Sequence, residues 1–142
     1  MKILLVLIKM FEGCRLLAYL CPAGIWTIGW GSTGKGITKG VRWTQEEADA
    51  RMESDATVYY LAAVKASPIL ITRNSAHCAV ADFVYNLGMG RYNSSTFKKR
   101  IDEGEWEDAA HELLKWVHGG GKVLPGLVLR RKEEIRLILS GE

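Results

Sequence analysis

Glu12 holds the position in this chain that best suits acid chemistry. Apolar residues recur at helical spacing from Ile3 to Ile8, and Gly13 is typical of a residue that ends a helix in the left-handed conformation. We therefore expect Glu12 at a helix C-terminus, where the partial negative charge of the helix disfavours a carboxylate and suits a proton donor. Arg15 is close in sequence, and its positive charge would instead favour the carboxylate form of Glu12.

Cys14, Cys21 and Cys78 are the other side chains with reactive atoms. Three cysteines cannot form a complete disulfide framework, and no Cys or His cluster has the spacing of zinc ligands. We therefore predict no metal and no cofactor, and a chain that folds in a reducing cytoplasm. Cys14 and Cys21 are seven residues apart, and a regulatory disulfide between them is one hypothesis, which strict bond geometry must decide. Cys78 falls on an apolar stripe and is predicted to be an inert core residue.

A glycine-rich run fits two nucleotide-binding patterns, GxGxxG and the beginning of a phosphate-binding P-loop. The run is Gly29-Trp30-Gly31-Ser32-Thr33-Gly34-Lys35. The P-loop needs a serine or threonine after the lysine, where Gly36 stands, and both motifs need a helix that begins at once. The segment 36–40 is a poor helix opening, so we interpret the run as a flexible turn beside a strand.

Length and composition limit the classes of protein. The 142 residues, 48% of them hydrophobic, suffice for one core, and we predict a single domain over residues 1–142. The net charge of +3 is too mild for a nucleic-acid clamp but compatible with an anionic polymer.

The apolar N-terminal segment could pass for a signal peptide, but Lys9 ends it far short of the ~20 residues that span a bilayer. We predict a first core helix and no membrane insertion.

Two short runs of apolar and branched residues, 16–20 and 25–30, predict a β-hairpin. Between them stands Cys21-Pro22-Ala23-Gly24, whose proline and glycine fit a type I turn. The glycine-rich stretch that follows is expected to hold a small third strand. Thr44 and Glu47 have the spacing of a capping box, which predicts the beginning of a long helix that runs to about Ala66.

Helical periodicity continues to the C-terminus. Apolar stripes predict helices over about 76–87, 97–101, 106–117 and 127–139, and Ser94 or Ser95 is a candidate cap for the second of them. The charged residues of the last helix are expected to form a solvated, charge-paired surface; they are Arg130, Arg131, Lys132, Glu133, Glu134 and Arg136.

The predicted fold class is α+β and mostly helical. A small antiparallel β lobe, approximately residues 13–43, is joined by the long helix to a helical C-terminal lobe, approximately residues 67–142, on which the first helix packs. A cleft is expected between the two lobes.

The order of short motifs resembles the phage lysozyme (endolysin) family over nearly the whole chain. The N-terminal signature is Phe11-Glu12-Gly13-Cys14-Arg15-Leu16, followed by Ala18-Tyr19, by Gly24-Ile25-Trp26-Thr27-Ile28-Gly29 and by Gly31. Further along stand Asp82-Phe83-Val84-Tyr85-Asn86-Leu87-Gly88, Ser95-Thr96-Phe97, Trp116, Pro125-Gly126-Leu127 and Arg130-Arg131. The resemblance implies a lysozyme-like fold of the class described above.

In that family a glutamate is followed by an aspartate nine residues later and by a threonine six after that. Glu12, Cys21 and Thr27 hold these places here, so the chain resembles the subset in which cysteine replaces the aspartate. The resemblance implies an endolysin, a glycoside hydrolase that cuts the β-1,4 bond between N-acetylmuramic acid and N-acetylglucosamine in peptidoglycan. Glu12 would be its general acid, and Cys21 with Thr27 would position the attacking water, which gives inversion.

The resemblance also implies substrate contacts. Trp26, Thr33, Tyr85 and Asn86 are expected to bind the polysaccharide, although the exposed edge of a core helix is an equal interpretation for Tyr85 and Asn86. Ser32 stands where many relatives have a histidine that is thought to tie the lobes together, which puts stability rather than chemistry in question.

A different function is a cell-wall binding module that kept the fold and lost catalysis with the aspartate. Intact Glu12 and Thr27 argue against it. As an endolysin the chain is expected to be a monomer that binds peptidoglycan and not nucleic acid. It would stay in the host cytoplasm until a holin releases it, and would then act on the cell wall in the periplasm to lyse the host.

Overall fold

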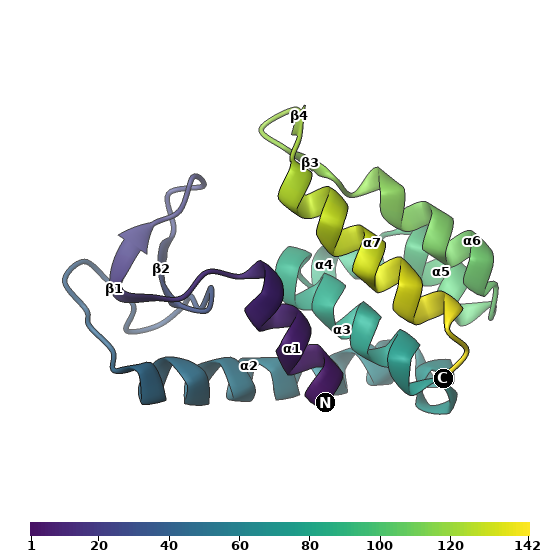
Figure 1. Cartoon of the computed structure of the whole chain (residues 1–142), viewed down its shortest axis with the longest axis horizontal. Coiled ribbons are helices and arrows are strands. Elements are labelled where there is room, and N and C mark those ends of the chain that lie inside the picture. The colour runs from purple at the N-terminus through teal and green to yellow at the C-terminus, as the bar shows by residue number, and fades with distance from the viewer.

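The computed structural model describes all residues, 1–142, as a β-hairpin and a group of helices that the long helix α2 connects (Figure 1). The α-helices are α1 (Lys2–Phe11), α2 (Gln45–Ala66), α3 (Asn74–Leu87), α4 (Met89–Asn93), α5 (Thr96–Asp102), α6 (Trp106–Glu112) and α7 (Pro125–Leu139). The strands are β1 (Arg15–Leu20), β2 (Trp26–Gly29), β3 (His118–Gly119) and β4 (Lys122–Val123), and the 3-10 helices are η1 (Pro68–Thr72) and η2 (Leu113–Lys115). None of the helices is both long enough and apolar enough to cross a membrane.

α1 presents its apolar side to the helical core, as its sequence periodicity predicts. Leu4, Leu7 and Ile8 are buried against the helices that follow. The helix ends at Glu12, whose backbone is extended with φ −95° and ψ 132° and whose N–H donates to the carbonyl of Ile8. The prediction of a left-handed Gly13 is wrong, because the extended backbone of Glu12 already turns the chain out of the helix and Gly13 does not have a positive φ.

The hairpin forms where the sequence predicts it. β1 and β2 pair in antiparallel fashion, with Tyr19 opposite Thr27, and the register shifts between Arg15 and Tyr19. The N–H of Gly24 donates to the carbonyl of Cys21 at 2.8 Å and closes the turn. The predicted third strand does not form: the loop makes only isolated bridges, Leu17 with Arg42 and Ile28 with Ser32, because its glycines bend the backbone too often for a ladder.

α2 begins with the predicted capping box, in which Thr44 and Glu47 each accept a hydrogen bond from the other's backbone N–H. It extends from the hairpin to the helical lobe (Figure 1). α3, the central helix of that lobe, is buried over most of its length and ends at Gly88, whose φ of +91° suits glycine.

The apolar core is divided very unequally. The helices enclose a cluster of 22 buried residues, whereas the hairpin and its loop enclose only Ala18, Ile28 and Ile37. The hairpin therefore depends on its attachments to the helices for a fixed position.

Side-chain hydrogen bonds supply these attachments, and three of them involve Trp30 or Ser32. Trp30 Nε1 donates to Asp49 on α2 at 2.7 Å, and Tyr85 on α3 donates to the carbonyl of Trp30 at 2.6 Å. Ser32 Oγ donates to Asp55 on α2 at 2.9 Å, and Ser32 is buried. Ser32, which stands where the resemblance expects a histidine that ties the lobes together, thus contacts α2.

The last helix contradicts its sequence interpretation. Arg130, Arg131 and Glu134 are 3%, 0% and 0% exposed, so half of the expected solvated surface is buried against α3. These three positions lie on the helix face that also carries Ile138, and their charges are accommodated because they meet opposite charges inside the protein. Only Lys132, Glu133 and Arg136 keep contact with solvent.

Candidate active site

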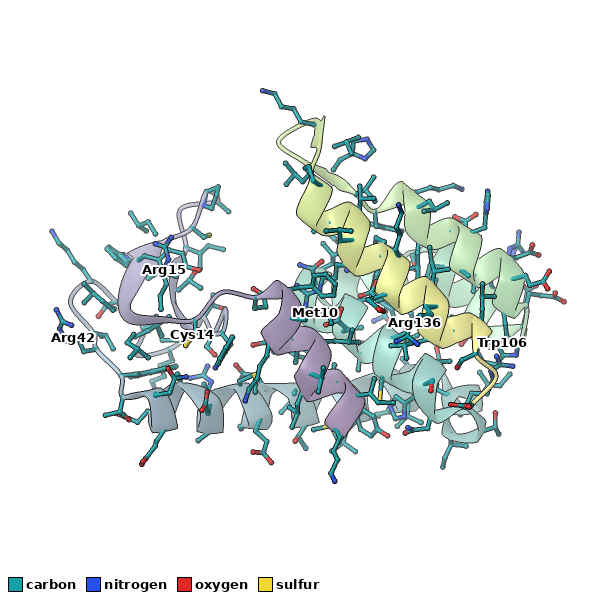
Figure 2. The ribbon with its side chains drawn as sticks, viewed as in Figure 1. Met10, Cys14, Arg15, Arg42, Trp106 and Arg136 are labelled. Carbon is teal, nitrogen blue, oxygen red and sulfur yellow. The ribbon has the colours of Figure 1, made fainter.

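Glu12 lies where α1 ends and the chain leaves for the hairpin, and its side chain is 24% exposed. Oε1 accepts a hydrogen bond from Nη1 of Arg130 at 2.9 Å. Arg130, rather than the Arg15 that the sequence suggested, is therefore the cation in contact with this carboxyl group. Arg15 instead places its guanidinium 4.4 Å from the centre of the Tyr19 ring, and Figure 2 shows it beyond the end of α1, beside Cys14.

Arg130 is itself held by a buried carboxylate. Its Nε and Nη2 atoms donate to the two oxygens of Asp82 at 2.9 and 2.8 Å, which fixes the plane of the guanidinium. Burial alone would raise the pKa of Asp82, but hydrogen bonds from Arg130 and Glu134 hold it below the ordinary value. The third nitrogen of Arg130 is thereby directed at Glu12.

Gly31 leaves room for the second oxygen of Glu12. A Cβ atom at residue 31 would stand 3.1 Å from Oε2, tighter than most real Cβ contacts, and the φ of +90° also favours glycine. Oε2 accepts no hydrogen bond from a protein group, so this oxygen is free to meet a ligand.

Two hollows adjoin this carboxyl group. One, of about 850 Å³, is formed mainly by the end of α1 and the beginning of α7 and is lined by Glu12, Leu127 and Arg130 among others. The other, of about 290 Å³, lies where the loop after β2 meets α2 and α3, and Gly31 and Tyr85 line it. Asn86 lines both hollows, Glu12 lines the larger and Gly31 the smaller; the two hollows together are called the groove.

Cys21 and Thr27 are brought together by the hairpin. The Cys21 N–H donates to the carbonyl of Ile25 at 3.0 Å, and the Thr27 hydroxyl donates to the same carbonyl at 2.9 Å. Hydrogen bonds lower the pKa of the Cys21 thiol, chiefly one from the backbone of Ile25, with smaller contributions from its neighbours and from the Thr27 hydroxyl. Thiolate therefore forms more readily here than in an ordinary cysteine.

The pKa of the Tyr19 hydroxyl is raised from its ordinary value. Partial burial raises its pKa most, and the charges of Glu12 and Cys21 add to that rise while Arg15 opposes it.

The structure does not bring Cys14 and Cys21 together. Both thiols are free, and the whole of β1 separates them. At about 3.3 Å per residue an extended strand of this length holds their Cα atoms on the order of 20 Å apart, whereas a disulfide needs less than about 7 Å. Cys14 instead accepts a hydrogen bond from Gln45, and Cys78 is fully buried in the core.

The four predicted substrate contacts lie in different surroundings. Thr33, Tyr85 and Asn86 share the smaller hollow, whereas Trp26 packs against the hairpin core and lines neither hollow. Burial raises the pKa of Tyr85, whose hydroxyl already donates to Trp30, so this side chain also joins the lobes. Asn86 uses its oxygen to accept from Arg131 at 2.9 Å.

Asp82, Arg130 and Gly31 are site residues that the sequence reasoning did not assign. A signal existed for the first: Asp82 interrupts an otherwise apolar helix stripe, and a charge on a buried face needs a partner. The partner comes from 48 positions further along the chain, a separation that periodicity does not reveal. No group of three or more His, Cys, Asp or Glu side chains is arranged to hold a metal ion.

A partly exposed carboxyl group in a groove, with one oxygen held by arginine and one open, has the geometry that the proton donor of a glycoside hydrolase needs. Comparison with known proteins agrees: the family model for phage lysozyme matches residues 9–134. The chain belongs to the phage lysozyme family.

Individual relatives extend the match to nearly the full length. An endolysin of Acyrthosiphon pisum secondary endosymbiont phage 1 is 37% identical over 140 residues, which cover 96% of this chain and 94% of the relative. The muramidase domain of SpmX from Asticaccaulis excentricus superposes with a TM-score of 0.86 at 31% identity, covering 99% of this chain and 97% of that domain. The active form of the P1 phage endolysin Lyz superposes with a TM-score of 0.83 at 30% identity. The match covers 99% of this chain and 85% of that one.

Proposed function

We propose that the chain is an endolysin that hydrolyses the β-1,4 bond between N-acetylmuramic acid and N-acetylglucosamine in peptidoglycan, and that Glu12 is its general acid. The observation that carries this proposal is the asymmetry of the Glu12 carboxyl group. Arg130 fixes Oε1, while Oε2 faces the groove beside Gly31 without a protein partner. A proton on Oε2 would thus stand at the position from which it can pass to a bridging sugar oxygen.

Cys21 and Thr27 would hold the water that attacks the anomeric carbon. The lowered pKa of the Cys21 thiol supports a role as proton acceptor, and the Thr27 hydroxyl lies at the same backbone carbonyl. Attack from the face opposite to the leaving group would invert the configuration of the sugar. The two groups then act in one step, with the water proton going to Cys21 and the Glu12 proton to the leaving oxygen.

The groove would bind the polysaccharide through both of its hollows. Asn86 lines both, and its amide N–H groups are free to donate to acetamido carbonyls because only its oxygen is engaged inside the protein. Thr33 and Tyr85 would line one sugar site, and Trp26 would take part only if a sugar reaches past the hairpin. The basic net charge of +3 is compatible with an anionic wall polymer.

Purified peptidoglycan tests the proposal. Glu12→Gln should lower kcat by about 10²–10⁴-fold, because the amide keeps the contact with Arg130 but has no acidic proton to give. The folding control is the circular dichroism spectrum and Tm of the same variant, and Glu53→Gln on the exposed side of α2 is the matched control. Digestion by Glu12→Gln at the wild-type rate would rule out the proposed role; tight wall binding without digestion by the wild type would instead favour a binding module.

The stereochemical outcome has a direct test. Proton NMR of fresh product should show the α-anomer first if the reaction inverts the β-linkage, whereas initial β-anomer would show retention.

In the cell, the proposed endolysin would act as a monomer, be made in the host cytoplasm and reach the periplasmic wall through a holin pore. Lysis of a host that expresses the chain should therefore depend on a co-expressed holin.

A further inference from the structure

Arg51 on α2 borders the groove and has no part in the proposed proton transfers. Among the residues that line the smaller hollow it is the one cation. Its side chain is 34% exposed, and its guanidinium lies 5.8 Å from the centre of the Trp43 ring. An arginine in this place can form charge-assisted hydrogen bonds with anionic groups of a bound polymer.

Two contacts within the protein fix the guanidinium of Arg51. Nε donates to Oδ1 of Asp55 at 2.9 Å, and Nη2 donates to the carbonyl of Thr33 at 2.9 Å. Asp55 and Thr33 line the same hollow as Arg51. Nη1 donates to no group of the protein, and a planar guanidinium that is held through two of its nitrogens presents the third in a fixed direction.

Arg130 shows in the same molecule how one arginine contacts two carboxyl groups. Asp82 holds its Nε and Nη2 atoms, and its Nη1 atom donates to Glu12 at 2.9 Å. Arg51 likewise uses Nε to contact a carboxylate, so its pairing with Asp55 leaves Nη1 able to contact a second one. No protein group takes that second place at Arg51, which leaves it to a ligand.

The other polar groups of the smaller hollow add donors rather than acceptors. Both oxygens of Asp55 already accept hydrogen bonds, from Arg51 and Ser32. The oxygen of Asn86 accepts from Arg131, which leaves its amide N–H groups free to donate. A cation beside free N–H donors suits a ligand group that is negatively charged and has more than one acceptor oxygen. A carboxylate has both properties.

We propose that Nη1 of Arg51 binds a carboxylate of the substrate, and that Arg51 thereby sets a preference for glycan that carries carboxylates over neutral glycan. The inference rests on the proposed function, since peptidoglycan offers two kinds of carboxylate: the lactyl group of muramic acid where the peptide is absent, and the peptide's own carboxylates where it is present. Gly31 lines the same hollow and lies against Oε2 of Glu12, so the carboxylate is bound close to the bond that is cleaved.

Neutralising the carboxylates of the substrate tests the preference. Soluble peptidoglycan strands are compared with the same strands after conversion of their carboxylates to methylamides, which keeps the sugars and removes the charge. For the wild type, KM should be about five- to tenfold lower with the native strands, as expected for a partly exposed charge-assisted hydrogen bond. Added salt should narrow this difference. Equal KM values for the two substrates at low salt would overturn the proposal.

Arg51→Met should remove the preference, because KM for the native strands rises to that for the methylamide strands. Arg100→Met is the matched control: Arg100 is 35% exposed and paired with Glu103, so this variant should keep the wild-type preference. A merely structural role of Arg51 predicts the opposite pattern. Arg51→Met would then lose activity equally on both substrates and keep the preference, and that result would contradict the inference.

Strands from which an amidase has removed the peptides distinguish the two sources of the carboxylate. If Arg51→Met raises KM for these stripped strands, Arg51 binds the lactyl carboxylate. If it raises KM only for strands that keep their peptides, Arg51 binds a carboxylate of the peptide. A KM that rises for neither kind of strand would overturn the proposal.

Nitrogen-15 NMR measures the contact without catalysis. In wild-type chain with labelled arginine, and with Arg51→Lys used to assign the signal, the Arg51 side-chain resonance should shift when a disaccharide-peptide fragment of the wall is added. It should stay in place with the methylamide of that fragment, and the Arg100 resonance should stay in place with both.

An Arg51 resonance that responds equally to both fragments, or to neither, would contradict the inference, even if Arg51→Met fails to fold. The titration also separates this inference from the proposed function. If Glu12→Gln proves fully active, the assignment of the general acid fails, whereas the titration still decides whether Arg51 binds a carboxylate.

Discussion

Glu12 and Cys21, to which the proposed reaction assigns the two proton transfers, are held in opposite ways. Glu12 contacts Arg130, which is buried and lies 118 positions away, and through it a helical core of 22 buried residues. Cys21 lies at the turn of a two-stranded hairpin whose core has three buried residues. Its backbone hydrogen-bond partners are its immediate neighbours, Gly24 and Ile25.

The positions of Glu12 and Cys21 therefore depend on different parts of the protein. The position of the acid is coupled to the stability of the whole helical lobe, because the same buried ion pairs serve both. The position of Cys21 depends on a local turn, so the chemistry at that residue can change without loss of the fold. A cysteine at residue 21, where the resemblance described above expects aspartate, is therefore compatible with this fold.

Arg130→Met should have the largest effect and should damage stability and activity together. It leaves the carboxylate of Asp82 buried without a counter-ion, which costs about 3–5 kcal/mol of unfolding free energy, and it frees Glu12. Urea denaturation and the rate of wall digestion measure the two effects. Arg100→Met is the control, because its ion pair with Glu103 is exposed and is worth at most about 1 kcal/mol. Equal stability losses would show that the acid is not coupled to the core.

Cys21→Ala should lower activity without lowering stability, in contrast to Arg130→Met. It removes the proposed proton acceptor and should lower kcat by about 10²-fold, while the Tm stays near that of the wild type because the side chain adds little to the core. Cys14→Ala is the matched control and should keep full activity. An unchanged kcat in Cys21→Ala would mean that Thr27 alone positions the water.

Cys21→Asp should move the pH dependence rather than abolish activity. The ordinary pKa of aspartate is about 3.9 and that of a thiol about 8.5, so the acid-side limb of kcat/KM should shift to lower pH in the variant. The hydrogen bonds that lower the pKa of Cys21 make this shift smaller than the difference between the ordinary values. A pH profile identical to that of the wild type would exclude Cys21 as the group that titrates on this limb.

Ser32→Ala should have the smallest effect of the four. It removes one hydrogen bond between the hairpin loop and Asp55, worth about 1 kcal/mol, and should increase amide hydrogen exchange in β1 and β2 more than in α3. Ser94→Ala is the control, because that hydroxyl bonds only to carbonyls within its own turn. A uniform change over both regions would indicate that the hairpin does not open separately.

Much of the local structure could be predicted because it follows from neighbouring residues. The capping box at Thr44, the turn at Cys21-Pro22-Ala23-Gly24 and the helix end at Gly88 each depend on backbone groups within four residues, and each is found in the structure. The order of motifs likewise identified the family, since it depends on the chain alone.

The charges of α7 could not be placed in this way. A helical stripe that contains Arg130, Arg131 and Glu134 has the same spacing on a solvated surface as in a core, and only the carboxylate that Asp82 brings from α3 makes burial favourable. The sequence by itself thus determined the elements, the family and the candidate acid. The tertiary structure decided which cation holds that acid, because the free energy of a buried charge depends on partners that the fold alone brings into contact.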